Sequence, residues 1–435
     1  MLPAGTRRLP RAVEGLAHLS RSRMQRIAAA LLAVSLAVLS GCAHGRAGSP
    51  AAPPPSLTPT SPDGPAGSRG PAGAVSAPAP EPVPAPRPGA PPEASSSAVP
   101  LPITVAAVGD VMMGSTFPDE TGSMLPEADG RRLFVEVQPL LAGADIAFGN
   151  LEGPLLDGGT SEKCAHAKPG RCYAFRTPTR FARRLQEAGF LVMSLANNHA
   201  GDFGEEGRAS TRMALERLGI RYAGAPGEVA RMDVRGVKVA LVAFSTSGGT
   251  NDLRDLPEAA RIVKDAAREA DIVVVSFHGG GEGADRQHVL PGPEEFLGED
   301  RGDLRAFART VVDAGADLVI GHGPHVVRGM EVLNGRLVAY SLGNFATYGG
   351  MNLSGPNGLT LVLEVRLARD GAFLGGRVHP VLQEKPGGPR IDPAGAIVPI
   401  LRDLSRADFG PTAVRVADDG TLSPPPAVAT SRPGG

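Results

Sequence analysis

The chain of 435 residues contains no tryptophan and only three cysteines, and aromatic residues make up just 4 % of it. Positive and negative side chains nearly cancel, which leaves a formal net charge of −1. No basic run stands out between residues 103 and 385, so we expect no nucleic-acid partner. The apolar run at residues 27–39 is too short to cross a bilayer as a helix. The sequence therefore gives no indication of nucleic-acid binding, and we expect no membrane-spanning helix in that run.

The apolar run has instead the length of a signal-peptide core, and the basic residue Arg26, which follows Met24, precedes it. It ends in the sequence LSGC at residues 39–42, which resembles the lipobox of bacterial lipoproteins, where the cysteine receives the lipid. We expect residues 1–42 to be a signal peptide with Cys42 as the lipid attachment site and Met24 as the true start. By resemblance to lipoprotein sorting, Ala43 favours the outer membrane, with the protein facing the periplasm or the surface. The alternative is an ordinary secretory signal followed by a chance cysteine.

Residues 43–102 consist largely of proline, alanine, glycine and serine. This stretch holds 18 of the 42 prolines and no aromatic residue. Such a composition cannot bury a core. We therefore predict a disordered linker that tethers the following domain near a membrane.

Between residues 103 and 385, short apolar runs alternate with amphipathic patterns, which favours an α/β fold with helices covering sheet faces. The predicted strands are 103–108, 146–148, 191–195, 239–244, 272–277, 318–320, 337–341 and 359–365. The predicted helices are 131–141, 181–188, 205–218, 258–270 and 304–314. From residue 386 to residue 435 the sequence is again rich in proline, glycine and alanine, and we predict a loose C-terminal tail.

Once Cys42 is assigned to the lipid, only Cys164 and Cys172 remain, and they lie in one short loop. In an oxidising compartment they would form a disulfide that stabilises the fold by about 2–3 kcal/mol. A zinc site that adds His166 is the alternative, although three ligands at this spacing fit no common zinc finger.

Polar residues follow six of the predicted strands directly. They are Asp110, Asn150, Glu152, Asn197, Asn198, His199, Asp202, His278, Glu282, His322, His325 and Asn344. Each alone is typical of a turn or a helix cap, as Asp202 would be. Together they predict one crevice at a sheet edge, where carboxylates, amides and imidazoles need a cation to compensate their burial.

These motifs occur in the order and approximate spacing of the CapA family, which the chain resembles. The family comprises bacterial capsule or poly-γ-glutamate synthesis proteins and is a branch of the calcineurin-like metallophosphatases. The matching segments are Gly109–Met112, Asn150–Glu152, Ala196–His199 with Asp202 and Gly204, His278 with Glu282, Gly321–Val326 and Ser341–Phe345. The resemblance implies a four-layer α-β-β-α sandwich with a two-metal centre at the strand ends.

The resemblance also implies a role for each of these residues. His199 and Asp202 would be catalytic, with His199 protonating the leaving oxygen, whereas Asn150, Asn197, Glu282 and Asn344 would contact the substrate or support the ligands. The implied metal ligands are Asp110, Glu152, Asn198, His278, His322 and His325. This oxygen and nitrogen donor set suits Mn²⁺, Fe or Zn²⁺.

Two residues depart from the family pattern. Met112 stands where the wider superfamily places a histidine, so one of the two metals is expected to bind weakly or to be absent. Gly279 replaces a tryptophan that relatives commonly carry, and we expect this to leave one wall of the pocket open, for a bulky or polymeric substrate.

The resulting hypothesis is an envelope-anchored, metal-dependent hydrolase linked to capsule or poly-γ-glutamate synthesis or export. Its expected partners are a surface polymer or a phosphoester substrate, a membrane contacted through the lipid, and the membrane subunits of a capsule-synthesis system. The first alternative is a non-catalytic polymer-binding or assembly subunit, and the second is a metal-stabilised structural lipoprotein. The presence of His199 beside all the other motifs favours the hydrolase and the assembly subunit.

Overall fold

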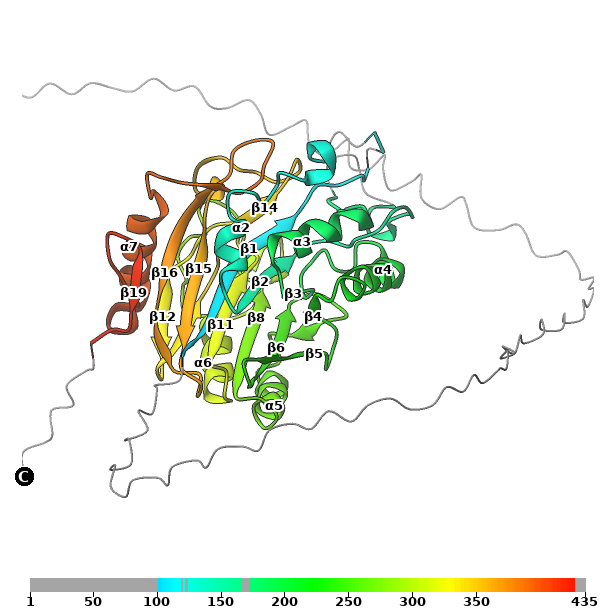
Figure 1. The fold of residues 1–435 in the computed structure, drawn as a ribbon. Coiled ribbons are helices and arrows are strands. Elements are labelled where there is room, and N and C mark those ends of the chain that lie inside the picture. Colours follow the sequence, from blue (N-terminus) through cyan, green and yellow to red (C-terminus); the bar gives the residue numbers. More distant parts are fainter. Residues whose placement is uncertain (1–100, 119, 122–123, 166–171, 427–435) are drawn as a thin grey trace, which may run out of the picture. The chain divides into compact units, whose positions relative to one another are not determined.

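The computed structural model describes residues 101–118, 120–121, 124–165 and 172–426 (Figure 1). They all belong to the second of two compact units, Glu93–Gly435. The predicted signal peptide with Cys42, residues 43–100 of the predicted linker, and His166 lie outside the described residues. In the described part, no helix combines the length and the apolar character needed to cross a membrane.

Two sheets form the centre of the domain. The first has ten strands in the order β18-β19-β16-β15-β1-β2-β3-β4, with β14 added beside β1 and β17 beside β16. Strand β1 pairs in parallel with β2 and β14 and antiparallel with β15. The bounds are β1 (Ile103–Met112), β2 (Ile146–Leu151), β3 (Val192–Ser194), β4 (Arg221–Ala223), β14 (Asn344–Thr347), β15 (Leu359–Leu367), β16 (Phe373–Leu382), β17 (Arg390–Ile391), β18 (Arg415–Val416) and β19 (Thr421–Ser423).

The second sheet has seven strands in the order β12-β13-β11-β8-β6-β5, with β7 beside β6. Its central strands β6, β8, β11 and β13 run parallel. The bounds are β5 (Val229–Val234), β6 (Val237–Ser245), β7 (Asn251–Asp252), β8 (Ile272–His278), β11 (Leu318–His322), β12 (Met330–Leu333) and β13 (Arg336–Ala339). A separate hairpin pairs β9 (Glu295–Phe296) with β10 (Glu299–Asp300).

Helices cover the outer faces of both sheets (Figure 1). Helices α2, α3 and α4 lie against the first sheet, and α5 and α6 lie against the second. The bounds are α2 (Gln138–Ala142), α3 (Ala182–Ala188), α4 (Gly204–Glu216), α5 (Leu256–Ala267), α6 (Leu304–Asp313) and α7 (Ile397–Phe409). Short 3-10 helices are η1 (Glu127–Gly130), η2 (Glu162–Cys164), η3 (Thr179–Phe181), η4 (Gly355–Gly358) and η5 (Gly410–Thr412). The expected α-β-β-α sandwich is confirmed.

The central strands are apolar on both faces because each face is covered. In β1, Val105 belongs to the core between the two sheets, whereas Val108 packs on the side of the helices. This alternation follows from the two-residue period of a strand. Phe148 of β2 and Ile320 of β11 join Val105 in the core between the sheets. Buried parallel strands therefore appear in the sequence as continuous apolar runs.

Two sequence predictions about the elements are wrong. The helix predicted at residues 131–141 begins only at Gln138, because residues 131–137 form turns. The loose tail predicted from residue 386 is wrong as far as residue 426, because this segment contributes β17, α7, β18 and β19. Proline and glycine around residues 386–396 masked an amphipathic pattern in α7, whose residues Ile397 and Leu401 are buried in the core between the sheets.

Leu401→Ala is expected to lower the free energy of unfolding by about 2–5 kcal/mol, because it leaves a cavity where α7 meets the core. Chemical denaturation followed by circular dichroism measures this change. Arg406→Ala, on the exposed face of the same helix, is the control and should change stability by less than about 0.5 kcal/mol. Equally small effects of both substitutions would mean that α7 does not pack on the domain.

Candidate metal centre

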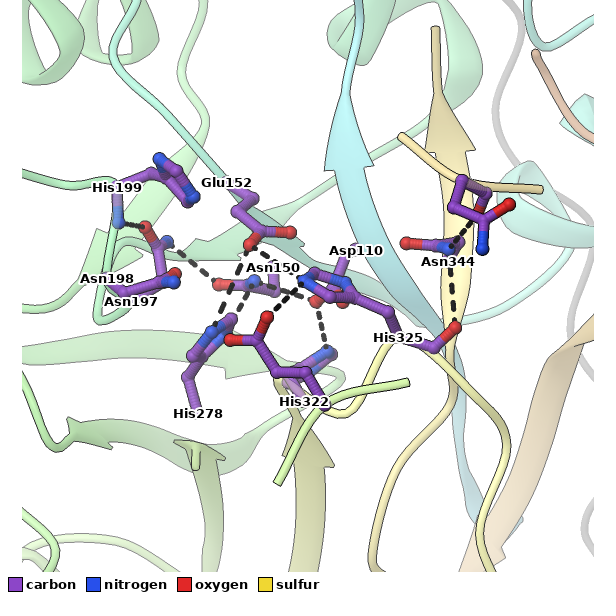
Figure 2. Close-up of polar contacts among 12 residues, drawn as sticks. Asp110, Asn150, Glu152, Asn197, Asn198, His199, His278, His322, His325 and Asn344 are labelled. Atoms are coloured by element: carbon purple, nitrogen blue, oxygen red, sulfur yellow. Dashed lines mark hydrogen bonds and ion pairs between the residues drawn. The ribbon is translucent and has the colours of Figure 1, made fainter. Parts of the chain in front are cut away.

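The candidate site lies where parallel strands of both sheets end (Figure 2). Asp110 in β1 pairs in register with Asn150 of β2 and with Asn344 of β14. In the second sheet, His278 at the end of β8 lies opposite His322 at the end of β11. Since parallel strands present their carboxyl ends at one edge of a sheet, residues far apart in the sequence meet there.

Gly109 allows β14 to approach β1 closely. A Cβ atom at position 109 would lie 1.9 Å from the carbonyl oxygen of Gly343, which no side chain could tolerate. The same carbonyl accepts a hydrogen bond of 2.9 Å from the backbone N–H of Asp110. The glycine therefore fixes the position of Asp110 beside the strand that carries Asn344.

Asp110 is the buried centre of the cluster. Its Oδ1 accepts a hydrogen bond of 2.9 Å from Asn150 Nδ2 and lies 3.3 Å from His322 Nδ1, while its Oδ2 lies 3.1 Å from His325 Nδ1. Burial opposes ionisation, but the imidazoles of His322 and His325 beside the carboxylate outweigh it and hold the pKa of Asp110 well below its usual range. Asp110 is therefore a carboxylate with two imidazoles directed at it.

Glu152 faces Asp110 across the site. One of its oxygens lies 3.7 Å from His325 Nε2 and 4.0 Å from His278 Nε2. Burial, and then the charge of Asp110, raise the pKa of Glu152 well above its usual value. A buried carboxylate beside a second carboxylate is unfavourable unless a positive charge joins them.

Two of the histidines, His325 and His278, differ in their electrostatic surroundings. Burial disfavours the charged form of His325, yet the negative charges of Glu152, Asp110 and Glu282 outweigh it and raise the pKa of His325 to about 10. Burial lowers the pKa of His278 well below its usual value, so this imidazole is a neutral donor of an electron pair. The backbone of His325 is left-handed, with φ of 58°, which turns its ring toward both carboxylates.

The donor atoms of the cluster fit a metal ion. Within the described residues, several buried polar atoms of the site have no hydrogen-bond partner: Glu152 Oε1 and Oε2, Asn198 Oδ1, His278 Nε2, and His322 Nδ1 and Nε2. Ligand atoms of Asp110, Glu152 and His325 all lie within 4.8 Å of one another. Unpaired buried donors beside such a group are costly unless they bind a cation.

A second group of polar residues, His199 and Asp202, lies next to the metal cluster, in the segment that follows β3. His199 Nδ1 and Asp202 Oδ2 are 2.7 Å apart, and both side chains are buried. Burial lowers the pKa of His199, while the hydrogen bond to Asp202 opposes that effect. The Phe175 ring lies against the imidazole with a centroid distance of 4.1 Å, and the Phe175 backbone N–H donates to Asp202 Oδ2 at 2.8 Å.

Hydrogen bonds through side-chain amides link His199 to the metal cluster. The His199 backbone N–H donates to Asn197 Oδ1 at 3.1 Å, and Asn197 Nδ2 donates to Asn150 Oδ1 at 3.1 Å. Asn150 in turn donates to Asp110. Figure 2 shows this path from His199 through the amides to Asp110. The position of His199 is therefore tied to that of the carboxylate in β1.

The structure brings most of the predicted site residues together. It also shows the individual contacts of three others, Asn198, Glu282 and Asn344. Asn198 is half-buried beside His199, and its side-chain oxygen has no partner within the described chain. Glu282 lies 3.9 Å from His325 Nε2, at the rim of the cluster. Asn344 instead donates to backbone carbonyl groups, including that of His325 at 3.3 Å (Figure 2).

Sequence patterns missed two basic residues at the site. Lys163 Nζ lies 2.6 Å from Asp202 Oδ1 and donates to the backbone carbonyl of Asn198 at 3.2 Å. Arg301 Nη2 lies 3.0 Å from Glu282 Oε1 and is almost fully buried. Neither follows one of the strands predicted from the sequence, so no feature of the sequence distinguished them from surface residues. The disulfide predicted beside Lys163 is present between Cys164 and Cys172.

The open wall predicted at Gly279 is wrong. A Cβ atom at this position would lie 2.8 Å from a side-chain carbon of Leu253 and 2.9 Å from the carbonyl oxygen of Arg301. Neighbouring residues therefore fill the space that a larger side chain would need. Met112, the other departure, is buried in β1.

Comparisons with known proteins agree with these motifs. The family model described as bacterial capsule synthesis protein PGA_cap matches residues 104–348. The capsule biosynthesis protein CapA of Bacillus anthracis is 30 % identical over 264 residues, which cover 56 % of this chain and 59 % of that protein. The PGA biosynthesis protein CapA of Bacillus subtilis (strain 168) is 30 % identical over 260 residues, which cover 56 % and 63 %. The chain thus spans only about three fifths of these relatives.

Among solved structures, a 5′-nucleotidase precursor from Thermus thermophilus is similar at 14 % identity, with 65 % of this chain and 54 % of that chain covered and a TM-score of 0.37. The family match covers more than half of the chain and includes the strand ends from Asp110 to Asn344. The chain therefore belongs to the PGA_cap family of bacterial capsule synthesis proteins.

Proposed function

We propose that this protein is an envelope-anchored, metal-dependent hydrolase of metallophosphatase type that acts in capsule or poly-γ-glutamate synthesis or export. The observation that carries the proposal is the close group of Asp110, Glu152 and His325, with unpartnered buried atoms of Glu152, His278 and His322, beside the His199–Asp202 pair. A site built only to stabilise the fold would have no need of a buried imidazole–carboxylate pair next to it.

The metal would be held by Asp110, Glu152, Asn198, His278, His322 and His325. Their oxygen and nitrogen donors suit Mn²⁺, Fe or Zn²⁺, and two metal sites are proposed, of which the second would be weakened by Met112. When bound, a divalent cation polarises a phosphoryl oxygen and lowers the pKa of water. The residues themselves fix the positions of the donors, since Gly109 and the amide chain hold Asp110 and His199 in place.

His199 would supply the proton for the leaving oxygen. Asp202 binds Nδ1 of the ring, which leaves Nε2 free to donate, and its negative charge stabilises the imidazolium. Lys163 and the Phe175 backbone N–H hold Asp202 in place from the other side. Phe175 also shields one face of the ring from water.

The place of action is proposed from the sequence and the relatives. The lipobox-like sequence that ends at Cys42 supports a lipid anchor in the outer membrane, with residues 43–102 as a tether. The names of the two CapA relatives support a role in capsule synthesis, together with a surface polymer and membrane subunits as partners. These names refer to biosynthesis and not to hydrolysis. They therefore also favour the second candidate function, a non-catalytic polymer-binding or assembly subunit.

Hydrolysis assays on the full chain separate the two candidates. Metal-stripped protein is given Mn²⁺, Fe²⁺ or Zn²⁺, and release of p-nitrophenol from p-nitrophenyl phosphate and from bis(p-nitrophenyl) phosphate is measured. The hydrolase proposal expects metal-dependent turnover of at least one substrate that is lost in Asn198→Ala. No turnover with any of the three metals would overturn it and favour the assembly subunit.

Lys163→Met is expected to lower kcat by a measurable factor of up to about tenfold, because Asp202 loses a charge-assisted hydrogen bond but keeps those from His199 and Phe175. Steady-state hydrolysis measures the change. Arg183→Met removes an exposed ion pair with Glu187 on α3 and should leave kcat unchanged. An unchanged kcat in Lys163→Met would show that Lys163 does not position the pair.

A further inference from the structure

Lys163 reaches the His199–Asp202 pair from the surface. Its side chain is 38 % exposed, whereas the Asp202 side chain is fully buried. The ammonium lies 2.6 Å from Asp202 Oδ1 and donates at 3.2 Å to the backbone carbonyl of Asn198, one of the proposed metal ligands. A long, partly exposed side chain loses conformational entropy when it is held in one place, so these contacts depend on how firmly its backbone is fixed.

The backbone of Lys163 gains little support from its own secondary structure. It belongs to the three-residue helix η2, and so short a helix is not stable alone. Before the helix, Ser161 donates its hydroxyl to the backbone carbonyl of Asp202 at 2.7 Å. At the end of the helix, Cys164 forms the disulfide with Cys172. The helix that carries Lys163 is therefore fixed by a hydrogen bond on one side and by the disulfide on the other.

The disulfide joins two segments that bind the same carboxylate. Cys164 directly follows Lys163, whose ammonium donates to Asp202 Oδ1. Cys172 lies three positions before Phe175, whose backbone N–H donates to Asp202 Oδ2 at 2.8 Å. Each oxygen of Asp202 thus receives a donor from a different side of the disulfide.

The two segments differ in their other supports. The segment of Phe175 continues into the buried Thr177. The backbone of Thr177 forms hydrogen bonds with those of Pro154 and Leu156, at 3.1 and 2.8 Å. Among the described residues, the backbone of η2 has no hydrogen bond to the backbone of a strand or of another loop. Loss of the disulfide would therefore release Lys163 and leave Phe175 in place.

We propose that the disulfide positions the ammonium of Lys163 on Asp202 and in this way raises the activity of the His199–Asp202 pair. The disulfide then has a role beyond stabilising the fold, because it fixes a donor that holds the carboxylate of the pair. The inference rests on the proposed function only for the activity of that pair.

A double-mutant cycle tests whether the disulfide acts through Lys163. The full Mn²⁺-loaded chain is compared with Cys164→Ala/Cys172→Ala, with Lys163→Met and with the triple variant, and kcat is measured on p-nitrophenyl phosphate. Alanine keeps an apolar side chain where Cys164 packs against Phe203. We expect removal of the disulfide to lower kcat by the same factor as Lys163→Met, up to about tenfold, and to have no further effect once Lys163 is replaced.

Two results of the cycle would overturn the inference. The first is an equal loss of kcat with and without Lys163, which would assign the disulfide to general stabilisation of the fold. The second is an unchanged kcat in the variant without the disulfide.

A second measurement needs no turnover. Each folded protein is treated with a limiting amount of acetic anhydride, and mass spectrometry follows acetylation of Lys163 relative to that of Lys264, which is exposed on α5. Because the ammonium must leave Asp202 before it reacts, we expect removal of the disulfide to raise the relative rate at Lys163 by at least about threefold. An unchanged rate would overturn the inference, whatever the effect on kcat.

Tyr173→Ala is the matched control. Tyr173 lies beside Cys172 and is 65 % exposed, so its replacement should change neither kcat nor the acetylation of Lys163. An equal effect in this control would show that any change in the segment disturbs the site, and would overturn the inference. Thermal melting verifies that each variant is folded. Reduction of the folded wild-type chain by tris(2-carboxyethyl)phosphine, which becomes the phosphine oxide as both sulfurs become thiols, gives the same comparison without substitution.

The two measurements separate this inference from the proposed function. Faster acetylation of Lys163 without the disulfide, in a wild-type chain that hydrolyses no phosphoester, would refute the hydrolase and keep the positioning of Lys163. Turnover with unchanged acetylation would refute the positioning alone.

Discussion

Glu152→Gln is expected to abolish the stabilisation that metal confers while leaving the metal-free protein at least as stable as the wild type. In the metal-free state, the Glu152 carboxylate is buried beside Asp110 with neither oxygen hydrogen-bonded, so a neutral amide of the same shape removes an unfavourable charge. With metal, the same substitution removes the carboxylate that we propose binds the ion. Wild-type protein with metal at a hundred times its Kd should gain about 2.7 kcal/mol of stability, and the variant none.

Thermal melting with and without Mn²⁺, at pH 8, measures both effects. Glu364→Gln is the matched control, because Glu364 also contacts a histidine, His379, at 3.0 Å but lies away from the cluster on β15. The control should keep the full response to metal. If Glu152→Gln instead destabilises the metal-free protein and leaves the metal response intact, Glu152 is a partner of His325 that stabilises the fold, and not a ligand.

His199→Ala is expected to lower kcat by about 10²–10⁴-fold, the usual contribution of a general acid. The loss should be larger for phenyl phosphate than for p-nitrophenyl phosphate, because the poorer leaving group depends more on receiving a proton. Steady-state kinetics with both substrates at saturating metal measures the difference. Metal content should stay at the wild-type level, since His199 is proposed to lie outside the ligand set.

His288→Ala is the control for this variant, because His288 also contacts a carboxylate, that of Asp408 at 2.7 Å, but is exposed and is not one of the site residues. It should leave kcat unchanged for both substrates. Equal losses for the two leaving groups in His199→Ala would assign His199 to positioning, and no loss would exclude it as the proton donor.

Much of the site could be predicted from the polar residues that lie where apolar strands end. Asp110, His278 and His322 each follow or end a buried apolar run, and parallel strands must present such positions at one edge. The alternation of apolar runs with amphipathic segments similarly predicted an α/β fold with helices covering the sheet faces, whereas the sandwich of two sheets was implied by the family resemblance. Local patterns were sufficient there because the period of a strand or helix determines which face is buried.

Other features depend on contacts that no local pattern records. Lys163 reaches Asp202 across 39 positions, and Arg301 reaches Glu282 from a loop. The packing around Gly279 depends on Leu253, which belongs to a different segment. For α7 the signal was present in the spacing of Ile397, Leu401 and Leu404, but the nearby prolines and glycines obscured it.

Metal analysis of the purified full chain tests the proposed cluster most directly. The protein is saturated with Mn²⁺, freed of unbound ions by gel filtration and analysed by plasma mass spectrometry beside the double variant Asp110→Asn/His322→Ala. A cluster that binds metal predicts one or two ions per wild-type chain and none in the variant. A wild-type chain without metal, or a variant that retains the same amount, would contradict it.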